Sequence, residues 1–307
     1  MVTFRHGWNP TPRELPRPRF DAALLAVAPP PSVDFYSAVP AVGLHLNDQW
    51  GCCTCAGDAN IIQGVTAYGQ GTETVVPDSA VLQAYEQSGF NPAAGPPGEN
   101  PTDQGWLISS ALQFLKYTGM AGHRIAAYGQ LEALGNHNAV MVCSAEFGYL
   151  SLGIYLPASA MDQFNAGHAW DVVARDGGIL GGHCICMCGY NATGPVAWTW
   201  GKPQQLTWAF WDTYVSEAWP VVSHDWVSAA SGKDPEGVDL VTLGAEFQSS
   251  VGQNPFPAGS VTPPSPYPAP LPAPVQPPPP APPAPVQGPG CLAGRVVSRL
   301  LGRRYSD

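Results

Sequence analysis

Two short segments of the sequence carry side chains that could form a nucleophile and its base. The first, residues 46–56, places Cys53 at the start of a predicted helix, where the partial positive charge of the helix N-terminus favours the thiolate. The second, residues 181–190, begins a predicted strand with His183 directly after two glycines. A thiol and an imidazole that meet in the fold make an activated nucleophile. The chemistry that these residues predict is acyl transfer through a thioester.

The elements that must position these side chains differ between the two halves of the chain. Helices are predicted at Cys53–Tyr68, Val81–Gln87 and Leu107–Tyr117. Strands are predicted within 143–156 and at His183–Tyr190 and Val196–Trp200. Helices in the first half and strands in the second predict an α+β fold with two subdomains rather than a doubly wound sheet.

Shifts in composition divide the chain into four segments. These are a Pro- and Arg-rich arm at 1–32, a globular domain at 33–248, a Pro-rich linker at 249–290 and a basic amphipathic helix at 291–307. Residues 255–289 hold 17 of the 35 prolines, and such a tract forms no core, so a disordered tail is expected. For the final segment, a docking peptide, a membrane-surface anchor and a solubilising tail all stay open.

The charge distribution excludes some partners. The formal net charge is −10, and residues 20–294 alone hold 5 basic and 21 acidic side chains. An acidic body repels phosphate, so the main domain is not expected to bind nucleic acid. No apolar run reaches the roughly 18–20 residues that span a bilayer, and no signal peptide is recognisable. A cytoplasmic or virion-associated protein without a transmembrane segment is the resulting expectation.

The cysteine spacing argues against a metal centre. Cys184, Cys186 and Cys188 alternate along one predicted strand and lack the paired Cys-x2-Cys spacing of zinc sites. We interpret them as buried small hydrophobic residues, and we interpret Cys55 and Cys143 as core residues in a helix and a strand. A cluster of Cys52, Cys53, Cys55 and His183 is the less favoured metal alternative. No metal and no cofactor are predicted.

Several motifs in order resemble those of the papain-like cysteine peptidases, over roughly residues 31–226. They are Pro31-Ser32-Val33-Asp34-Phe35, Gly51-Cys52-Cys53-Thr54, Gln104-Gly105-Trp106, Ser110-Ala111-Leu112-Gln113-Phe114, His183 with Gly189-Tyr190, and Trp200-Gly201. Residues 47–63 and 199–219 look closer still to a bacterial and phage branch of that superfamily. The resemblance implies a papain-like fold with a helical N-terminal half and an antiparallel, barrel-like sheet in the C-terminal half.

The resemblance also implies a set of site residues. The family keeps a side-chain amide six residues before its nucleophile, and two registers satisfy this, Asn47 with Cys53 and Gln49 with Cys55. The first is favoured because it alone puts Gly51 two residues before the cysteine and a threonine directly after it. His183 would be the general base and acid, and Asn47 with the Cys53 N–H would form the oxyanion hole.

One position departs from the family pattern. Where the family has the asparagine that orients the histidine, this chain has Trp198, which offers no acceptor. Thr199 or a backbone carbonyl is left to orient the imidazole, and Trp200 is expected to support it. The family's zymogens also carry a long inhibitory segment, and residues 1–32 are too few for a globular prodomain.

Two functional hypotheses follow from these residues. The first is a cysteine peptidase acting on a peptide or protein substrate through a Cys-His dyad. The alternative is a papain-like fold without turnover that serves as a binding or structural module, for example in a phage particle. The retained Cys53 and His183 favour the enzyme, and Trp198 favours the module.

Overall fold

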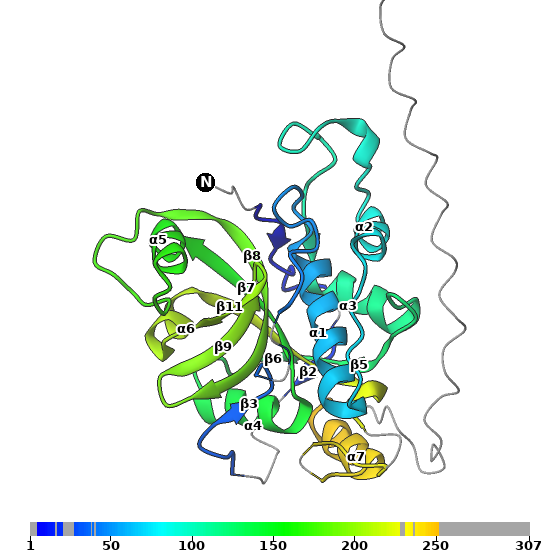
Figure 1. The fold of residues 1–307 in the computed structure, drawn as a ribbon. Coiled ribbons are helices and arrows are strands. Elements are labelled where there is room, and N and C mark those ends of the chain that lie inside the picture. The colour runs from blue at the N-terminus through cyan, green and yellow to red at the C-terminus, as the bar shows by residue number, and fades with distance from the viewer. Residues whose placement is uncertain are drawn as a thin grey trace, which may run out of the picture. The chain divides into compact units, whose positions relative to one another are not determined.

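The computed structural model describes residues 5–15, 17–20, 28–37, 39, 41–227, 231–235 and 237–251. Within these ranges the chain is mixed helix and sheet, as the sequence predicts (Figure 1). Nearly all of the predicted Pro-rich linker and the whole of the predicted basic helix lie outside the described residues. Among the helices of the described part, none combines the length and the apolar character that crossing a bilayer requires.

Helices precede the long strands, as predicted, but further helices also lie between and after those strands. The helices are α1 (Cys53–Gln70), α2 (Asp78–Glu86), α3 (Ile108–Tyr117), α4 (His137–Phe147), α5 (Ala158–Ala166), α6 (Trp208–Tyr214) and α7 (Leu240–Val251), with short 3-10 turns at Pro92–Ala94 and His224–Trp226. The strands are β1 (Trp8–Asn9), β2 (Arg19–Phe20), β3 (Val33–Asp34), β4 (Trp106–Leu107), β5 (Ile125–Tyr128), β6 (Gln130–Leu131), β7 (Leu150–Pro157), β8 (Ile179–Asn191), β9 (Gly194–Thr199), β10 (Lys202–Gln205) and β11 (Val215–Ser223).

The central helix α1 is buried along most of its length because it packs against other elements on several sides. Its contacts include β7 and β8 of the sheet and the helices α2 and α3 (Figure 1). Gly64 permits the close approach to the sheet, since a Cβ there would lie 2.3 Å from the ring of Tyr149. The helix ends at Gly71, whose left-handed φ of 67° lets its N–H bond the carbonyl of Thr66.

The main sheet has seven strands and is antiparallel throughout. Its order is β10-β9-β8-β7-β11-β5, and β3 pairs with the far end of β8. The long strand β8 is therefore flanked by β7 and β9, and residues 183–190 of it are buried. Its cysteines Cys184, Cys186 and Cys188 are buried with them, as expected for small core side chains.

The described part of the N-terminal arm is not a free extension. Its two short strands, β1 and β2, each form a parallel pair with the body, with β4 and β6 respectively. Trp8 lies in the hydrophobic core and is 3% exposed. Composition predicts an extended arm here, and the fold gives its described part partners in the body.

One stretch predicted as strand is helical at its start. Residues 143–156 were expected to be extended, but Cys143 lies in α4 and the strand β7 begins at Leu150. The side chain of Asn136 caps this helix by accepting the N–H of Ala139. The cap and the burial of the apolar residues that follow override their weak helix propensity. Cys143 is therefore a buried helix residue.

Candidate active site

Cys53 is the first residue of α1, at the junction between a loop and the helix. It is 1% exposed, and its Sγ accepts a hydrogen bond of 3.3 Å from the backbone N–H of Cys184 on β8. The next turn of the helix also lies close to the strand, since a Cβ on Gly57 would be in van der Waals contact with the Cys184 sulfur at 3.6 Å. The thiol is thus held between the N-terminus of α1 and the sheet.

His183 reaches the same place from β8. Its Nε2 lies 2.8 Å from the hydroxyl oxygen of Thr199 on the neighbouring strand β9. Its ring stacks on Trp200 at a centroid distance of 4.4 Å and an interplanar angle of 16°. Its Nδ1 is buried without a hydrogen-bond partner. The imidazole is therefore fixed by two neighbours and keeps one ring nitrogen available.

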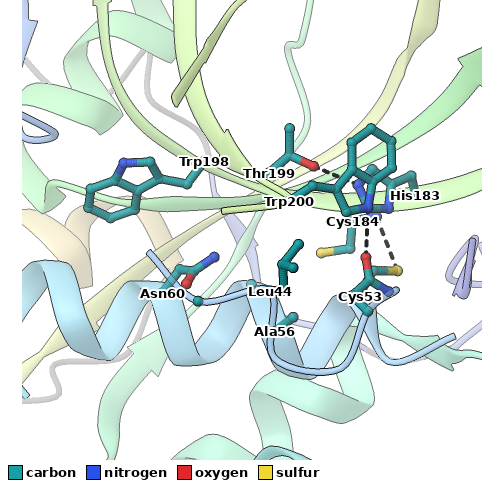
Figure 2. Close-up of a pocket in the computed structure, with 12 residues that line it drawn as sticks. Leu44, Cys53, Ala56, Asn60, His183, Cys184, Trp198, Thr199 and Trp200 are labelled. Carbon is teal, nitrogen blue, oxygen red and sulfur yellow. Dashed lines mark hydrogen bonds between the residues drawn. The ribbon is translucent and has the colours of Figure 1, made fainter. Parts of the chain in front are cut away.

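Asn47 completes the cluster from the loop that precedes α1. Its Oδ1 accepts a 2.9 Å hydrogen bond from the indole Nε1 of Trp200, which fixes the orientation of the amide. The Nδ2 group donates to the carbonyl of Trp50 at 3.1 Å and to that of Arg5 at 3.4 Å. Asn47, Cys53 and His183 line one small cavity, together with Trp198 and Thr199 (Figure 2).

The N-terminal arm crosses this cluster and covers it. The ring of His6 lies 6.0 Å from the ring of His183, and the carbonyl of Gly7 accepts a 2.7 Å hydrogen bond from the N–H of Trp106. Arg5 pairs with Asn47 through its own N–H, at 3.0 Å from the Asn47 carbonyl. Gly7 has to be glycine here, because a Cβ would lie 1.7 Å from the carbonyl oxygen of Gly51. The arm therefore lies against the loop that carries Cys53 and against the side chain of His183.

Burial sets the protonation state of the cysteine and histidine in this arrangement. It raises the pKa of the Cys53 thiol to about 11, although the N–H groups of Cys184 and Gly7 act in the opposite direction. Burial lowers the pKa of His183 well below its usual range, and the neighbouring His6 adds to this effect. Both groups are uncharged at neutral pH while the arm is in place.

The other site residues that the sequence suggested take different positions. Cys55 is buried in α1 and Gln49 is exposed, and neither lines the cavity with Cys53 and His183. Trp198 points away from the imidazole, and its ring stacks on Tyr149 at 5.4 Å (Figure 2). Thr199, one of the suggested orienting groups, is the one that contacts His183.

Sequence reasoning missed the part that the arm and Asp103 play. The Asp103 carboxylate accepts the N–H of Gly51 at 2.9 Å and the hydroxyl of Tyr85 at 2.7 Å, and so holds the loop before Cys53. Its only sequence signal is its place beside the Gln104-Gly105-Trp106 motif. Gly7 and Trp8 belong to no motif that identifies them.

Metal ligation finds no support in the geometry. Within the ranges that the structure describes, no three His, Cys, Asp or Glu side chains are grouped so as to hold a metal ion. All seven cysteines of these ranges are buried and free of disulfides. The cluster instead offers a thiol, an imidazole and an amide donor, a set suited to acyl transfer.

Comparisons of structure connect this geometry with known proteins. No protein-family model and no curated protein sequence matches the chain. Among solved structures, xylellain, a cysteine protease from Xylella fastidiosa, superposes with a TM-score of 0.55 at 13% identity, covering 72% of this chain and 96% of its own. Procathepsin L 3 from the Tenebrio molitor larval midgut matches with a TM-score of 0.49 at 13% identity, over 72% of this chain and 76% of its own.

The superposition on xylellain settles the fold. Identity of 13% over 96% of that chain means that the two proteins share an architecture while most side chains differ. The chain has the papain-like fold, as its motifs led us to expect. Its chemistry has to be argued from its own residues.

Proposed function

We propose that the protein is a latent cysteine peptidase whose nucleophile is Cys53. The observation that carries the proposal is the convergence of the Cys53 thiol, the His183 imidazole and the Asn47 amide on one cavity. His183 is the general base and acid. The oxyanion hole is made by the backbone N–H of Cys53 and by the Asn47 Nδ2 hydrogen that the Arg5 carbonyl gives up when the arm leaves. The substrate is a peptide or protein.

The reaction runs in two steps through these groups. His183 Nδ1 takes the thiol proton, and the thiolate attacks the carbonyl carbon of the substrate. The C–N bond then breaks, and the imidazolium gives its proton to the departing amine, which leaves a thioester on Cys53. A water molecule that gives a proton to His183 attacks the thioester, and the acid product departs as the thiol reforms. No cofactor takes part.

Thr199 replaces the asparagine that the family places in the position of Trp198. Its hydroxyl oxygen lies 2.8 Å from Nε2, and the proposed mechanism requires Nε2–H to donate to it, so that Nδ1 keeps its lone pair. Trp200 supports both partners, because it stacks on the imidazole and its Nε1–H holds the Asn47 amide. The orienting role of the missing asparagine is thereby shared between two neighbouring residues.

The arm accounts for the latency. The backbone N–H of Gly7 acts to lower the pKa of the Cys53 thiol, but an N–H group offers no electrophilic carbon for the sulfur to attack. It also excludes water, and the desolvated thiol stays protonated. We infer that activity begins when residues 5–11 leave the cleft. Water then returns, while the N–H of Cys184 and the terminus of α1 still favour the thiolate.

A second candidate, a non-catalytic module, has one observation in its favour. Trp8 lies in the hydrophobic core with 3% exposure, as a permanent structural strand would. In that case the arm never leaves and the thiol never ionises at physiological pH.

The two candidates differ in an assay of peptide hydrolysis. We would mix a quenched fluorescent peptide library with the full-length Gly7→Ala variant, in which we expect the clash with Gly51 to displace the arm. The proposal expects hydrolysis that disappears on adding Cys53→Ala or His183→Ala and persists with Cys55→Ala. Loss with Cys55→Ala and retention with Cys53→Ala would assign the other register. A folded variant with no hydrolysis at all supports the module.

A further inference from the structure

Cys184 brings a second thiol next to Cys53, and the proposed reaction uses its backbone N–H but not its side chain. It follows His183 on β8 and is 3% exposed. Its backbone nitrogen lies 3.3 Å from the Cys53 sulfur, so its Cα is at most about 4.8 Å from the same sulfur. Disulfide formation requires such an approach, because the two Cα atoms have to lie within about 7 Å of each other.

The Cys184 sulfur lies against the face of α1 at whose end Cys53 stands. A Cβ on Gly57 would meet this sulfur at 3.6 Å. Gly57 is four residues after Cys53, and helix positions four apart share a face. Figure 2 shows the side chains of Cys53 and Cys184 close to each other where the helix meets the strand. A rotation about the Cα–Cβ bond of Cys184 is therefore the movement that brings the two sulfurs together.

The two cysteines nearest to Cys53 in the sequence are placed less well for a bridge. Cys55 is two residues along α1, and helix positions two apart face different directions. The Cys52 sulfur donates to the carbonyl of His45 at 3.3 Å, and a bridge between adjacent residues would strain the peptide that joins them. The tertiary structure thus offers Cys184 as the partner of Cys53.

We infer that Cys184 is the resolving cysteine of a disulfide that forms with Cys53 when the open site meets hydrogen peroxide. The inference rests on the proposed function, because Cys53 meets solvent once the arm has left. The Cys53 thiol gives its proton to His183, and the thiolate attacks one oxygen of the peroxide. The O–O bond breaks, and the departing hydroxide takes the proton from His183 and leaves as water. Cys53 then carries a sulfenic acid.

Cys184 resolves this sulfenic acid. Its sulfur attacks the Cys53 sulfur, the S–O bond breaks, and the departing hydroxide leaves with the Cys184 proton as a second water. Two thiols are thereby oxidised to one disulfide, and one peroxide is reduced to two waters. Burial raises the pKa of the Cys184 thiol well above its ordinary value, which protects it from direct oxidation. The bridge switches the nucleophile off and prevents its irreversible oxidation to sulfinic acid, and an added thiol restores it.

The test maps the cysteines of the full-length Gly7→Ala protein after exposure to hydrogen peroxide at pH 7. Remaining thiols are blocked with iodoacetamide, and the peptides are identified by mass spectrometry without reduction. We expect a peptide pair joined through Cys53 and Cys184. After dithiothreitol, Cys53 should take up at least about tenfold more label than in the added Cys184→Ala variant, where oxidation continues to the sulfinic acid. Cys186→Ala removes another buried thiol of β8 and should change nothing.

Each result decides separately on this inference and on the proposed function. Peptide hydrolysis by the reduced protein, with no bridge to Cys184 after peroxide, overturns the bridge and leaves the peptidase intact. A bridge between Cys53 and Cys184 in a protein that hydrolyses no peptide supports the bridge and overturns the peptidase. A bridge from Cys53 to Cys52 or Cys55 overturns the assignment of Cys184. A folded protein that neither hydrolyses peptides nor forms a bridge overturns both. If Cys184→Ala fails to fold, the peptide map of the Gly7→Ala protein still decides.

Discussion

Replacing Gly7 by alanine should convert a silent thiol into a reactive one. Gly7 is buried against the loop before Cys53, and an added Cβ would lie 1.7 Å from the carbonyl oxygen and 2.3 Å from the carbonyl carbon of Gly51. Both atoms belong to the backbone, so no side-chain rotation relieves the clash. We expect residues around position 7 to leave the cleft and to expose Cys53 to water.

The size of the effect follows from the pKa of Cys53. With the arm in place that pKa is about 11, against an ordinary value of 9.0, and burial is the largest cause. At pH 7 the thiolate fraction is then on the order of 10⁻⁴, and removing the burial effect raises it to on the order of 10⁻². The rate of alkylation should rise at least about 100-fold. The terminus of α1 and the N–H of Cys184 act further in the same direction.

The assay is pulse labelling with iodoacetamide at pH 7, followed by mass spectrometry of each cysteine peptide. Gly135→Ala is the matched control, because a Cβ at Gly135 meets no atom within 4 Å. Cys143, buried in α4, is the internal reference for general unfolding. The reasoning is refuted if the folded Gly7→Ala protein labels at Cys53 no faster than the control. Parallel acceleration at Cys143 would instead report loss of the fold.

Three further predictions concern the site and its supporting helix. In the Gly7→Ala background, Thr199→Val should lower kcat roughly 10- to 100-fold while Thr199→Ser retains most of it, and equal loss in both would exclude the hydroxyl as the orienting group. Asn47→Ala should lower kcat about 100- to 1000-fold in steady-state hydrolysis assays, and an unchanged kcat would remove it from the oxyanion hole. Burial raises the pKa of Asp58 in α1 well above 3.8, so the folded state binds a proton that the unfolded state has released. Folding stability therefore falls as pH rises above about 4, and Asp58→Asn should raise the urea midpoint at pH 7 with a gain that shrinks towards pH 4, whereas a pH-independent gain would contradict this origin.

The local parts of the structure were accessible from the sequence alone. The three-residue spacing of Ala56, Ala59, Ile62 and Val65 predicted α1, and the structure has it from Cys53 to Gln70. The same local reasoning put Cys53 at a helix start and His183 on a strand, and both positions are confirmed. Sequence patterns succeed for this helix and this strand because both elements depend on neighbours within a few residues. It failed at Cys143, where a capped helix precedes the strand.

Partners from distant parts of the chain decided the rest. Thr199 contacts His183 only because β8 and β9 are adjacent, and the N–H of Cys184 reaches the Cys53 sulfur only because β8 packs against α1. The arm that composition described as extended proves to lie across the thiol, and no local pattern in residues 5–11 encodes that contact.

The protonation state of Cys53 also depends on both the local sequence and the tertiary structure. From the sequence, a cysteine at a helix N-terminus is expected to have a lowered pKa, because the helix dipole acts within one turn. In the folded protein burial outweighs that influence, and the pKa of Cys53 is raised. Residue types and spacing were thus enough to single out Cys53, His183 and Asn47 as candidates for acyl-transfer chemistry. Desolvation depends on every segment packed around the thiol, so only the tertiary structure decided that these groups are held uncharged beneath the arm.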